Sequence, residues 1–332
     1  MAQILRTVLA QDITVAAAAS TQQYDLPVNP LSVILCTLKA LNETSTVTAY
    51  SAFQAFFDKL TRARVSYRGA SIIDGAPLDL VVIYAILTKW LPHQGQVNNT
   101  DNDTRSITFP LLFGRKPYDP AECFPASRRG ELLLDLTFGA DPAGMDTFIL
   151  QLETVELLDA APERFIKTTF SDRIMASGEG NDVEIPIGNK ILGMLARAAT
   201  FPTAASYNSS FGQIALEVDN VEVIYSRTNW ETLQGEIARR LIPGWNFYQH
   251  SHQENTAVAY TQNASTLQTR NDNPPVQQYG YLDLDPMGDG SYALDTRGAA
   301  RVNLAITSDV TDASASRVQF IEEVPTGAAA AA

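Results

Sequence analysis

Residues 298–306 read Gly-Ala-Ala-Arg-Val-Asn-Leu-Ala-Ile, and Val302, Leu304 and Ile306 occupy alternate positions in this stretch. Alternate residues of an extended chain point to the same face, so the pattern predicts a strand with one buried face. Similar β-branched and aromatic runs, bounded by Pro, Gly, Asn and Asp, include Leu31–Leu38, Arg64–Tyr67, Glu131–Phe138, Phe148–Val155, Gln213–Val218, Val221–Tyr225 and Arg301–Thr307. Many short strands of this kind predict an all-β sandwich or barrel.

Helices are predicted at few places, always between strands. One apolar stripe with helical spacing is formed by Phe53, Phe56, Phe57 and Leu60. A second helix is predicted after a capping box in which Thr228 bonds to the amide of Glu231. Its buried face would consist of Trp230, Leu233, Ile237 and Leu241. A third candidate follows Pro77, where Val81-Val82-Ile83 leaves helix and strand both open.

The two halves of the chain resemble each other. Leu26-Pro27-Val28-Asn29-Pro30 is echoed by Ile185-Pro186-Ile187-Gly188-Asn189, and an apolar run follows each. Val65-Ser66-Tyr67-Arg68 is echoed by Val223-Ile224-Tyr225-Ser226-Arg227, and a candidate helix follows each.

Near the end of each half the correspondence continues at a spacing of 168 positions. It aligns Arg129-Gly130 with Arg297-Gly298, Leu136 with Leu304, Phe138 with Ile306, Asp141 with Asp309, Leu150 with Val318, Gln151 with Gln319 and Leu152 with Phe320. Any two all-β segments share alternating patterns, but the conserved order of landmarks favours a duplicated domain.

This pattern predicts a two-domain chain. We expect an N-terminal arm over residues 1–22, a first domain over 23–158, a linker over 159–182, a second domain over 183–326 and a disordered tail over 327–332. The linker is suggested by Ala160-Ala161-Pro162 and by Ser177-Gly178-Glu179-Gly180.

Composition excludes several classes of protein. Charged residues make up 18% of the 332 residues, below the roughly 25% usual for soluble domains. The many Asn, Gln, Thr and Ser residues suit a surface that is covered by copies of the same chain. With a net charge of −13 and only short basic runs, the chain is not expected to bind nucleic acid sequence-specifically. The longest apolar run, Leu80–Leu87, is too short for a membrane span, and the first 20 residues lack the basic region of a signal peptide.

The two cysteines, Cys36 and Cys123, do not constitute a disulfide framework, and Cys36 is expected to be a buried free thiol.

Candidate chemistry is sparse, and we expect no catalytic residue, no cofactor and no metal site. His250, His252 and Glu254 alternate as metal ligands on a strand would, but His93 is far upstream and a polar loop is the preferred interpretation. Asp283–Gly290 is similar to a calcium loop, but Met287 and Leu294 occupy ligand positions, so a tight turn with Gly288 and Gly290 at positive φ is preferred.

Nucleophile elbows and phosphate-binding loops are absent from the sequence. The carboxylate pairs Glu153 with Glu156 and Glu322 with Glu323 are expected to be solvated or interfacial. Arg105 and Arg128-Arg129 are expected either at the surface or in ion pairs between subunits.

Three segments carry a resemblance to a known family: Tyr24–Leu31, Phe109–Pro120 and Asn229–Leu233. Together with the duplication, they make the chain from about Tyr24 to Val324 similar to the double jelly-roll major capsid proteins of tailless icosahedral viruses, the bacteriophage members above all. This resemblance implies an all-β fold of two tandem eight-stranded jelly-roll β-barrels with a few short helices between strands.

The resemblance also implies a function and partners. The chain would be a non-enzymatic structural protein that forms a homotrimer, a pseudo-hexameric capsomer, and tiles the icosahedral shell of a virion assembled in the host cytoplasm. Met1–Ser20 would contact neighbouring capsomers, a membrane, or minor capsid and penton proteins. The polar segments Leu91–Ser106 and Gln249–Tyr279 would pack between barrels and subunits.

Two other classes stay open on sequence grounds. A carbohydrate-binding β-sandwich or fibre protein would display exposed aromatic platforms, whereas Trp90, Trp230 and Trp245 lie on or near apolar segments. A cupin-like metalloenzyme would need a metal at the histidine pair His250 and His252.

Overall fold

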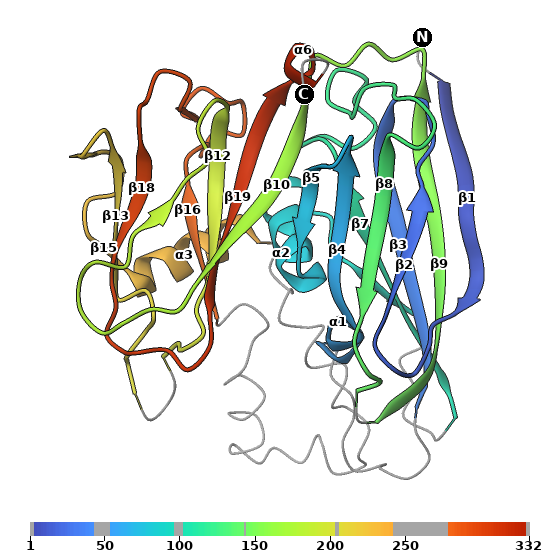
Figure 1. Cartoon of the computed structure of the whole chain (residues 1–332), viewed down its shortest axis with the longest axis horizontal. Helices are drawn as coiled ribbons and strands as arrows, with labels where there is room; N and C mark the ends of the chain where they lie inside the picture. The colour runs from blue at the N-terminus through green and yellow to red at the C-terminus, as the bar shows by residue number, and fades with distance from the viewer. Residues whose placement is uncertain are drawn as a thin grey trace. The chain divides into compact units, whose positions relative to one another are not determined.

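The computed structural model describes residues 3–42, 54–95, 102–142, 144–202, 206–241 and 278–329. Within these residues the chain divides into two compact units: unit 1 comprises the described residues up to 166 and 325–329, and unit 2 comprises those of 167–241 and 278–324. Both units are built mainly from antiparallel strands (Figure 1).

The elements of unit 1 are β1 (Gln3–Thr14), β2 (Ser20–Asp25), β3 (Leu31–Asn42), α1 (Gln54–Lys59), β4 (Leu60–Tyr67), β5 (Ala70–Gly75), α2 (Pro77–Thr88), β6 (His93–Gly95), β7 (Thr104–Leu112), β8 (Leu132–Phe138), β9 (Met145–Leu158), the start of β10 (Arg164–Arg173) and α6 (Thr326–Ala329). One sheet has the strand order β1-β9-β3-β7-β6, and β5-β4-β8-β2 are neighbours in another. Every second residue of β8 is buried, as the alternation of its sequence predicts.

Unit 2 contains the rest of β10, then β11 (Val183–Glu184), β12 (Lys190–Arg197), β13 (Gln213–Val218), β14 (Val221–Glu222), β15 (Thr228–Asn229), α3 (Trp230–Arg240), β16 (Tyr279–Asp283), β17 (Leu294–Asp295), β18 (Val302–Thr307) and β19 (Ser316–Pro325). Its neighbouring strands are β16-β12-β19-β10 in one sheet and β11-β18-β13-β14 in the other. Side chains from both sheets form one hydrophobic core, which includes Met194, Leu216, Leu304 and Phe320.

The two units repeat the same eight-stranded arrangement within the described residues. The order β7-β3-β9-β1 corresponds to β16-β12-β19-β10, and β5-β4-β8-β2 corresponds to β14-β13-β18-β11. This is the predicted tandem jelly roll, with one difference. The sheets described are open at their edges, so each unit is a two-sheet sandwich and not a closed barrel.

Matching hydrogen bonds fix the correspondence residue by residue. The amide of Leu26 donates to the carbonyl of Leu132 at 3.0 Å, and the amide of Ile185 donates to that of Val302 at 2.9 Å. The predicted equivalence of Leu26-Pro27 with Ile185-Pro186 is therefore confirmed. The same bonds align β8 with β18 at a spacing of 170 positions.

The hairpins that follow β4 and β13 also match. Each has a two-residue turn, with Arg68 (φ 48°) before Gly69 in unit 1 and Asp219 (φ 51°) before Asn220 in unit 2. Positive φ at both central residues is the feature of the tight turns that suit twisted hairpins. The predicted match of Val65–Arg68 with Val223–Arg227 is wrong, because the turn of unit 2 lies earlier. Ile224 itself has a φ of 59°, which is incompatible with the strand predicted up to Tyr225.

A β-bulge occurs at the same point of each repeat. The register between β3 and β9 shifts between Leu31 and Val33, and the register between β12 and β19 shifts between Ile191 and Gly193. Leu31 lies opposite Glu156, and Ile191 lies opposite Glu322. The spacing between β9 and β19 is therefore 166 positions.

The predicted spacing of 168 positions is thus two residues out of register in both late strand pairs, in opposite directions. Because side chains alternate with a period of two, an error of two residues keeps every side chain on its correct face. The sequence pattern alone therefore cannot detect the error, and the hydrogen bonds are needed to correct it.

A buried glutamate secures the loop before the first long strand of each repeat. In unit 1, Glu156 accepts hydrogen bonds from Asn29 at 2.7 Å and from the Thr7 hydroxyl at 2.6 Å. In unit 2, Glu322 accepts them from Asn189 at 2.7 Å and Thr169 at 3.3 Å, and Lys167 adds an ion pair at 3.0 Å. The two carboxylates are 2% and 0% exposed, so the expectation of solvated or interfacial groups is wrong for both.

Replacing Asn29 with alanine is expected to lower the free energy of unfolding by about 1.5–3 kcal/mol, because a hydrogen bond to a buried charge is lost. Replacing Asn189 should cost less, since Glu322 keeps its ion pair with Lys167. Chemical denaturation of the two variants tests this order, with the exposed Asn208→Ala as a control that should change little. A larger loss of unfolding free energy for Asn189→Ala than for Asn29→Ala would contradict the stabilising role given to the Lys167–Glu322 ion pair.

The hydrogen bonds of Thr7 and Thr169 show that β1 and β10 are equivalent strands of the two repeats. Thr7 of β1 and Thr169 of β10 bond to the same oxygen, Oε1, of the two glutamates. β1 pairs along β9 from Gln3 to Thr14, within the segment expected to be an arm, and β10 lies within residues 159–182, expected to be a linker. The division between units falls inside β10. The domain boundaries themselves stay a prediction.

The helices agree with the sequence in position more than in detail. α1 buries Phe56 and Phe57 as predicted, although Leu60 begins β4 and Phe53 lies outside the described residues. α2 begins at Pro77, as one of the two alternatives allowed, and is buried on all sides. No helix in the described part of the chain has the length and apolarity needed to cross a membrane.

The predicted capping box at α3 is wrong. Thr228 pairs with Ile214 in the short strand β15, and the N-cap residue is Asn229, which makes no side-chain cap hydrogen bond. Its side-chain oxygen Oδ1 accepts a hydrogen bond from Nε2 of Gln213 instead, at 3.1 Å. The predicted buried face of α3 is confirmed, since Trp230, Leu233, Ile237 and Leu241 are at most 8% exposed.

Candidate functional site

Most sequence candidates for metal binding lie outside the described residues. His250, His252 and Glu254 lie outside the described residues, as does most of Gln249–Tyr279. His93 begins β6 and is exposed. Within the described ranges, no group of three or more His, Cys, Asp or Glu side chains is arranged to hold a metal ion.

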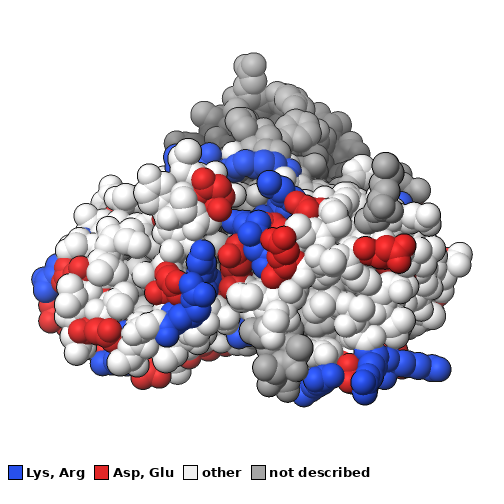
Figure 2. Space-filling model, turned by 90° about the horizontal axis from the view of Figure 1, so that it is seen from above, with Lys and Arg blue, Asp and Glu red and all other residues white. Residues whose placement is uncertain are grey.

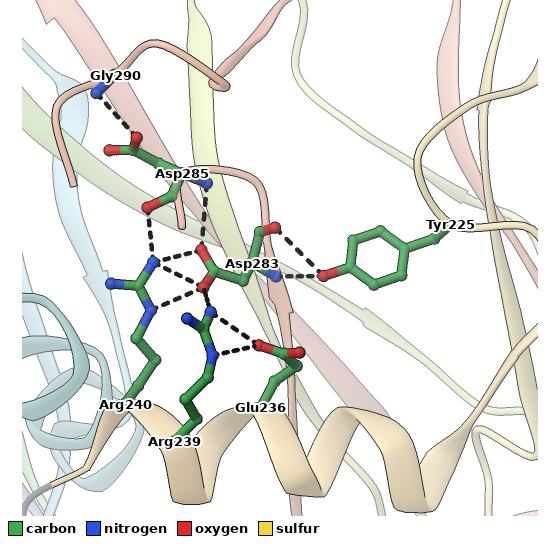
Figure 3. Close-up of polar contacts among 7 residues, drawn as sticks. All are labelled: Tyr225, Glu236, Arg239, Arg240, Asp283, Asp285 and Gly290. Carbon is green, nitrogen blue, oxygen red and sulfur yellow. Dashed lines mark hydrogen bonds and ion pairs between the residues drawn. The ribbon is translucent and has the colours of Figure 1, made fainter. Parts of the chain in front are cut away.

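The segment Asp283–Gly290 ends in a turn, and Gly288 and Gly290 have φ angles of 70° and 79°. The amide of Gly290 donates to Asp285 at 2.8 Å, which closes the turn. This confirms the preferred interpretation of the segment. Asp283 and Asp285 nevertheless take part in a polar cluster centred on Asp283, which the sequence did not predict (Figure 3).

Two arginines at the end of α3 converge on Asp283 of β16 (Figure 3). Arg240 binds both carboxylate oxygens, from Nε to Oδ2 and from Nη2 to Oδ1, at 2.7 Å each, and its Nη2 also donates to the carbonyl of Asp285 at 2.6 Å. Arg239 adds a bond to Oδ2 at 2.5 Å. The hydrogen bonds with Asp283 raise the pKa of Arg240 above its usual value. The bidentate geometry fixes the last turn of α3 against the sheet.

Tyr225 completes the cluster from the opposite side. Its hydroxyl accepts a hydrogen bond from the amide of Asp283 at 2.7 Å. Burial raises the pKa of Tyr225 to about 12, so the phenol stays protonated at neutral pH. Both carboxylate oxygens of Asp283 accept hydrogen bonds from guanidinium groups, so this carboxylate is not placed to exchange a proton with a substrate. The cluster stabilises the contact between α3 and β16.

A second buried cluster lies in unit 1, after β7. Glu122 is 3% exposed and binds Nη2 of Arg115 and Nη2 of Arg164 through Oε1, at 2.7 Å each. Burial alone would raise the pKa of Glu122, but the hydrogen bonds from Arg115 and Arg164 outweigh it, and the pKa lies below its usual value. Gly114 is required beside it, because a Cβ there would meet the backbone of Glu122.

The other predicted charged groups separate in the structure. The Glu153 side chain is 44% exposed and lies 3.9 Å from Arg6, whereas Glu156 is buried. Arg128 and Arg129 are exposed. Arg105 is only 2% exposed, so the expectation of surface placement is wrong for it, and burial lowers its pKa to about 10.

Both cysteines are free and buried, as expected for Cys36. Burial raises the pKa of Cys36 far above its usual value and raises that of Cys123 to about 12. Because the thiolate is the reactive form, neither residue is suited to nucleophilic catalysis in the folded chain.

A hollow of about 230 Å3 in unit 2 lies against β13 and β18. The charged residues around it are Glu179, Asp182, Glu217, Glu222 and Arg227. This acidic lining does not suit a phosphate or another anion. On the face drawn in Figure 2, most Lys and Arg side chains lie beside Asp or Glu, in small groups separated by uncharged surface. The described Lys and Arg side chains drawn there therefore provide no continuous basic surface for nucleic acid.

The tryptophans do not constitute a sugar-binding platform in the described residues. Trp230 is 1% exposed. Trp90 is half-buried and stacks on Tyr118, with ring centroids 6.4 Å apart. Trp245 lies outside the described residues.

No protein-family model and no curated protein sequence matches the chain. Solved structures do match it, over 97% of its length. The major capsid protein of STIV, the Sulfolobus turreted icosahedral virus, has a TM-score of 0.64 at 11% identity, with 97% of that chain covered. The chain has the fold of viral major capsid proteins. The bacteriophage PM2 major capsid protein has a TM-score of 0.58 at 10% identity, with 97% of that chain covered.

The capsid-protein fold is also matched by a chain of the PBCV-1 virus capsid, with a TM-score of 0.55 at 8% identity and 94% of that chain covered. Because each match spans nearly the whole length of both chains, the likeness extends over both units. The double jelly-roll fold class predicted from the sequence is therefore confirmed.

Proposed function

We propose that this chain is the major capsid protein of a tailless icosahedral virus: a non-enzymatic building block that associates with copies of itself and resides in the virion shell. The observation that carries the proposal is the full-length match to capsid proteins from three viruses. The repeated eight-stranded arrangement supports it, since two like units per chain make a trimer nearly six-fold and suitable for hexagonal tiling.

The chemistry of the described residues agrees with a structural role. The buried carboxylates Asp283, Glu122, Glu156 and Glu322 all bind protein groups. Each therefore stabilises the fold, and none is poised as an acid or base toward a pocket. The net charge of −13 favours protein contacts over direct binding of the genome. Minor capsid, penton or membrane proteins of the virion are proposed as further partners.

The mass of the full chain in solution tests the proposal. We expect light scattering behind a sizing column to give three times the 36.2 kDa chain mass, and electron microscopy of that fraction to show particles of hexagonal outline. A monomer at every concentration that can be reached would contradict self-association. The sample should be compared at low and high salt, because contacts through uncharged side chains resist screening.

A further inference from the structure

Strand β1 presents an unusually apolar exposed edge. It is the first strand of its sheet, and no described strand pairs with its other side. Four of its large hydrophobic side chains are solvent-exposed: Ile4 at 61%, Leu5 at 41%, Val8 at 57% and Ile13 at 40%. Long apolar edge strands are normally blocked or covered, so this edge requires a partner.

The equivalent strand of the second repeat is covered within the chain. Counting back three residues from the equivalent threonines places Ile4 of β1 at the position of Ile166 of β10. Ile166 is only 2% exposed, and its amide donates to the carbonyl of Phe113 at 2.7 Å. The preceding Phe165 packs edge-on against Phe124, with ring centroids 5.1 Å apart. The first residues of β10 therefore pack against the loop 113–124 of unit 1.

Unit 2 has an equivalent of that loop, residues 284–294. The amides of Phe113 and Leu284 donate to the carbonyls of Ser32 and Leu192, which are equivalent residues of β3 and β12. At the other end, Phe124 pairs with Leu31, and Leu294 pairs with Ile191, the first bulge residue of each repeat. Loop 284–294 therefore has the place in unit 2 that loop 113–124 has in unit 1.

Loop 284–294 is uncovered where loop 113–124 is covered. Tyr292 has the position of Glu122, because each lies two residues before the residue that pairs with the bulge, Leu294 or Phe124. Glu122 is buried and bound by Arg164 of β10, whereas Tyr292 is 63% exposed. Met287 in the same loop is 70% exposed. Leu294 is only half-buried, although its counterpart Phe124 is 0% exposed.

We propose that β1 of one copy docks on loop 284–294 of a second copy, repeating between chains the contact that β10 makes with loop 113–124. The inference rests on the proposed self-assembly and names its surface. Ile4 and Val8 share one exposed face of β1, and the exposed apolar side chains of the loop are Met287 and Tyr292, so the two surfaces are of matching chemistry.

Such a contact joins two different surfaces, head to tail. A contact of this kind either closes into a ring or propagates as a filament, and a ring of three chains would place six repeats around one axis. The edge of β1 would then be covered in every copy, as the edge-strand argument requires.

Disulfide trapping tests the inference with the full chain. The double variant Ile4→Cys/Tyr292→Cys is expected to give, after mild oxidation, a covalent species of three chains on a denaturing gel. Each single variant should stay at the mass of one chain, because a head-to-tail contact brings residue 4 to residue 292 and not to its own copy. The natural Cys36 and Cys123 are buried and do not compete.

A matched control pairs Ile4→Cys with Tyr207→Cys, an 88% exposed position near the end of β12, whereas loop 284–294 lies at the start of β12, and this pair should stay monomeric on the gel. A disulfide-linked dimer from either single variant would overturn the inference, since it would require a two-fold contact. A trimer by light scattering without covalent trapping would overturn this inference alone. An unmodified chain that is monomeric by light scattering would overturn the proposed function as well.

Discussion

Replacing Glu122 with alanine is expected to lower the free energy of unfolding by about 3–5 kcal/mol, because two guanidinium groups then lose a buried partner. Arg115, whose side chain is 9% exposed, would bear most of this cost, since Arg164 is 40% exposed and is partly solvated without its partner. Chemical denaturation at fixed protein concentration measures the loss. Glu153→Ala is the matched control, because its 3.9 Å ion pair with Arg6 is exposed and should contribute almost nothing.

The same carboxylate makes stability depend on acid pH. The pKa of Glu122 in the folded chain lies below its usual value of 4.5, so the folded state favours the ionised form. Its contribution is therefore complete above pH 4.5 and is lost as the pH falls through the depressed value. The unfolding free energy of Glu122→Gln should fall less on acidification than that of the unmodified chain. Parallel pH profiles for the two proteins would contradict a depressed pKa.

Replacing Trp230 with alanine is the second large change, with an expected loss of about 3–5 kcal/mol. Trp230 is 1% exposed, lies parallel to Phe211 with centroids 5.7 Å apart, and packs against β16 at Gly280. A Cβ at position 280 would come within 2.9 Å of the indole ring, so Gly280→Ala alone should also destabilise unit 2.

A double-mutant cycle separates this packing from general damage. In Trp230→Ala/Gly280→Ala the added methyl group enters the space left by the indole, so the combined loss should be smaller than the sum of the single losses. Denaturation of the four proteins measures the coupling. Strict additivity would mean that the indole and residue 280 do not share a contact.

Alternation and turn residues were sufficient to predict the class of fold, since β3, β8, β13 and β18 lie where the apolar runs are. The same signal could not determine the alignment between the repeats. The two-residue errors in the predicted partners of Leu136 and Leu150 leave the inward face of each strand unchanged. Local motifs failed where tertiary pairing competed with them. Thr228 is recruited into β15, and the capping box it was expected to form does not exist.

The polar clusters were out of reach for a different reason. Glu122 and Arg164 are 42 positions apart, and Arg240 and Asp283 are 43 apart, so nothing in the neighbouring sequence indicates that they meet. An alternating strand pattern indicates which positions face inward, but a glutamate at such a position is predicted to be solvated because its buried partners cannot be seen in the sequence. The fixed partners of Glu156 and Glu322 appear only once the repeats are folded.

The distribution of the two cysteines gives the chain a built-in reporter. Both lie in unit 1, Cys36 at the centre of β3 and Cys123 beside Glu122, and unit 2 contains none. A thiol reagent can reach them only when that unit opens, so the rate of labelling measures the breathing of the first repeat and ignores the second. In the proposed shell the same rate, read without any engineered probe, would report how far assembly restrains one half of each subunit.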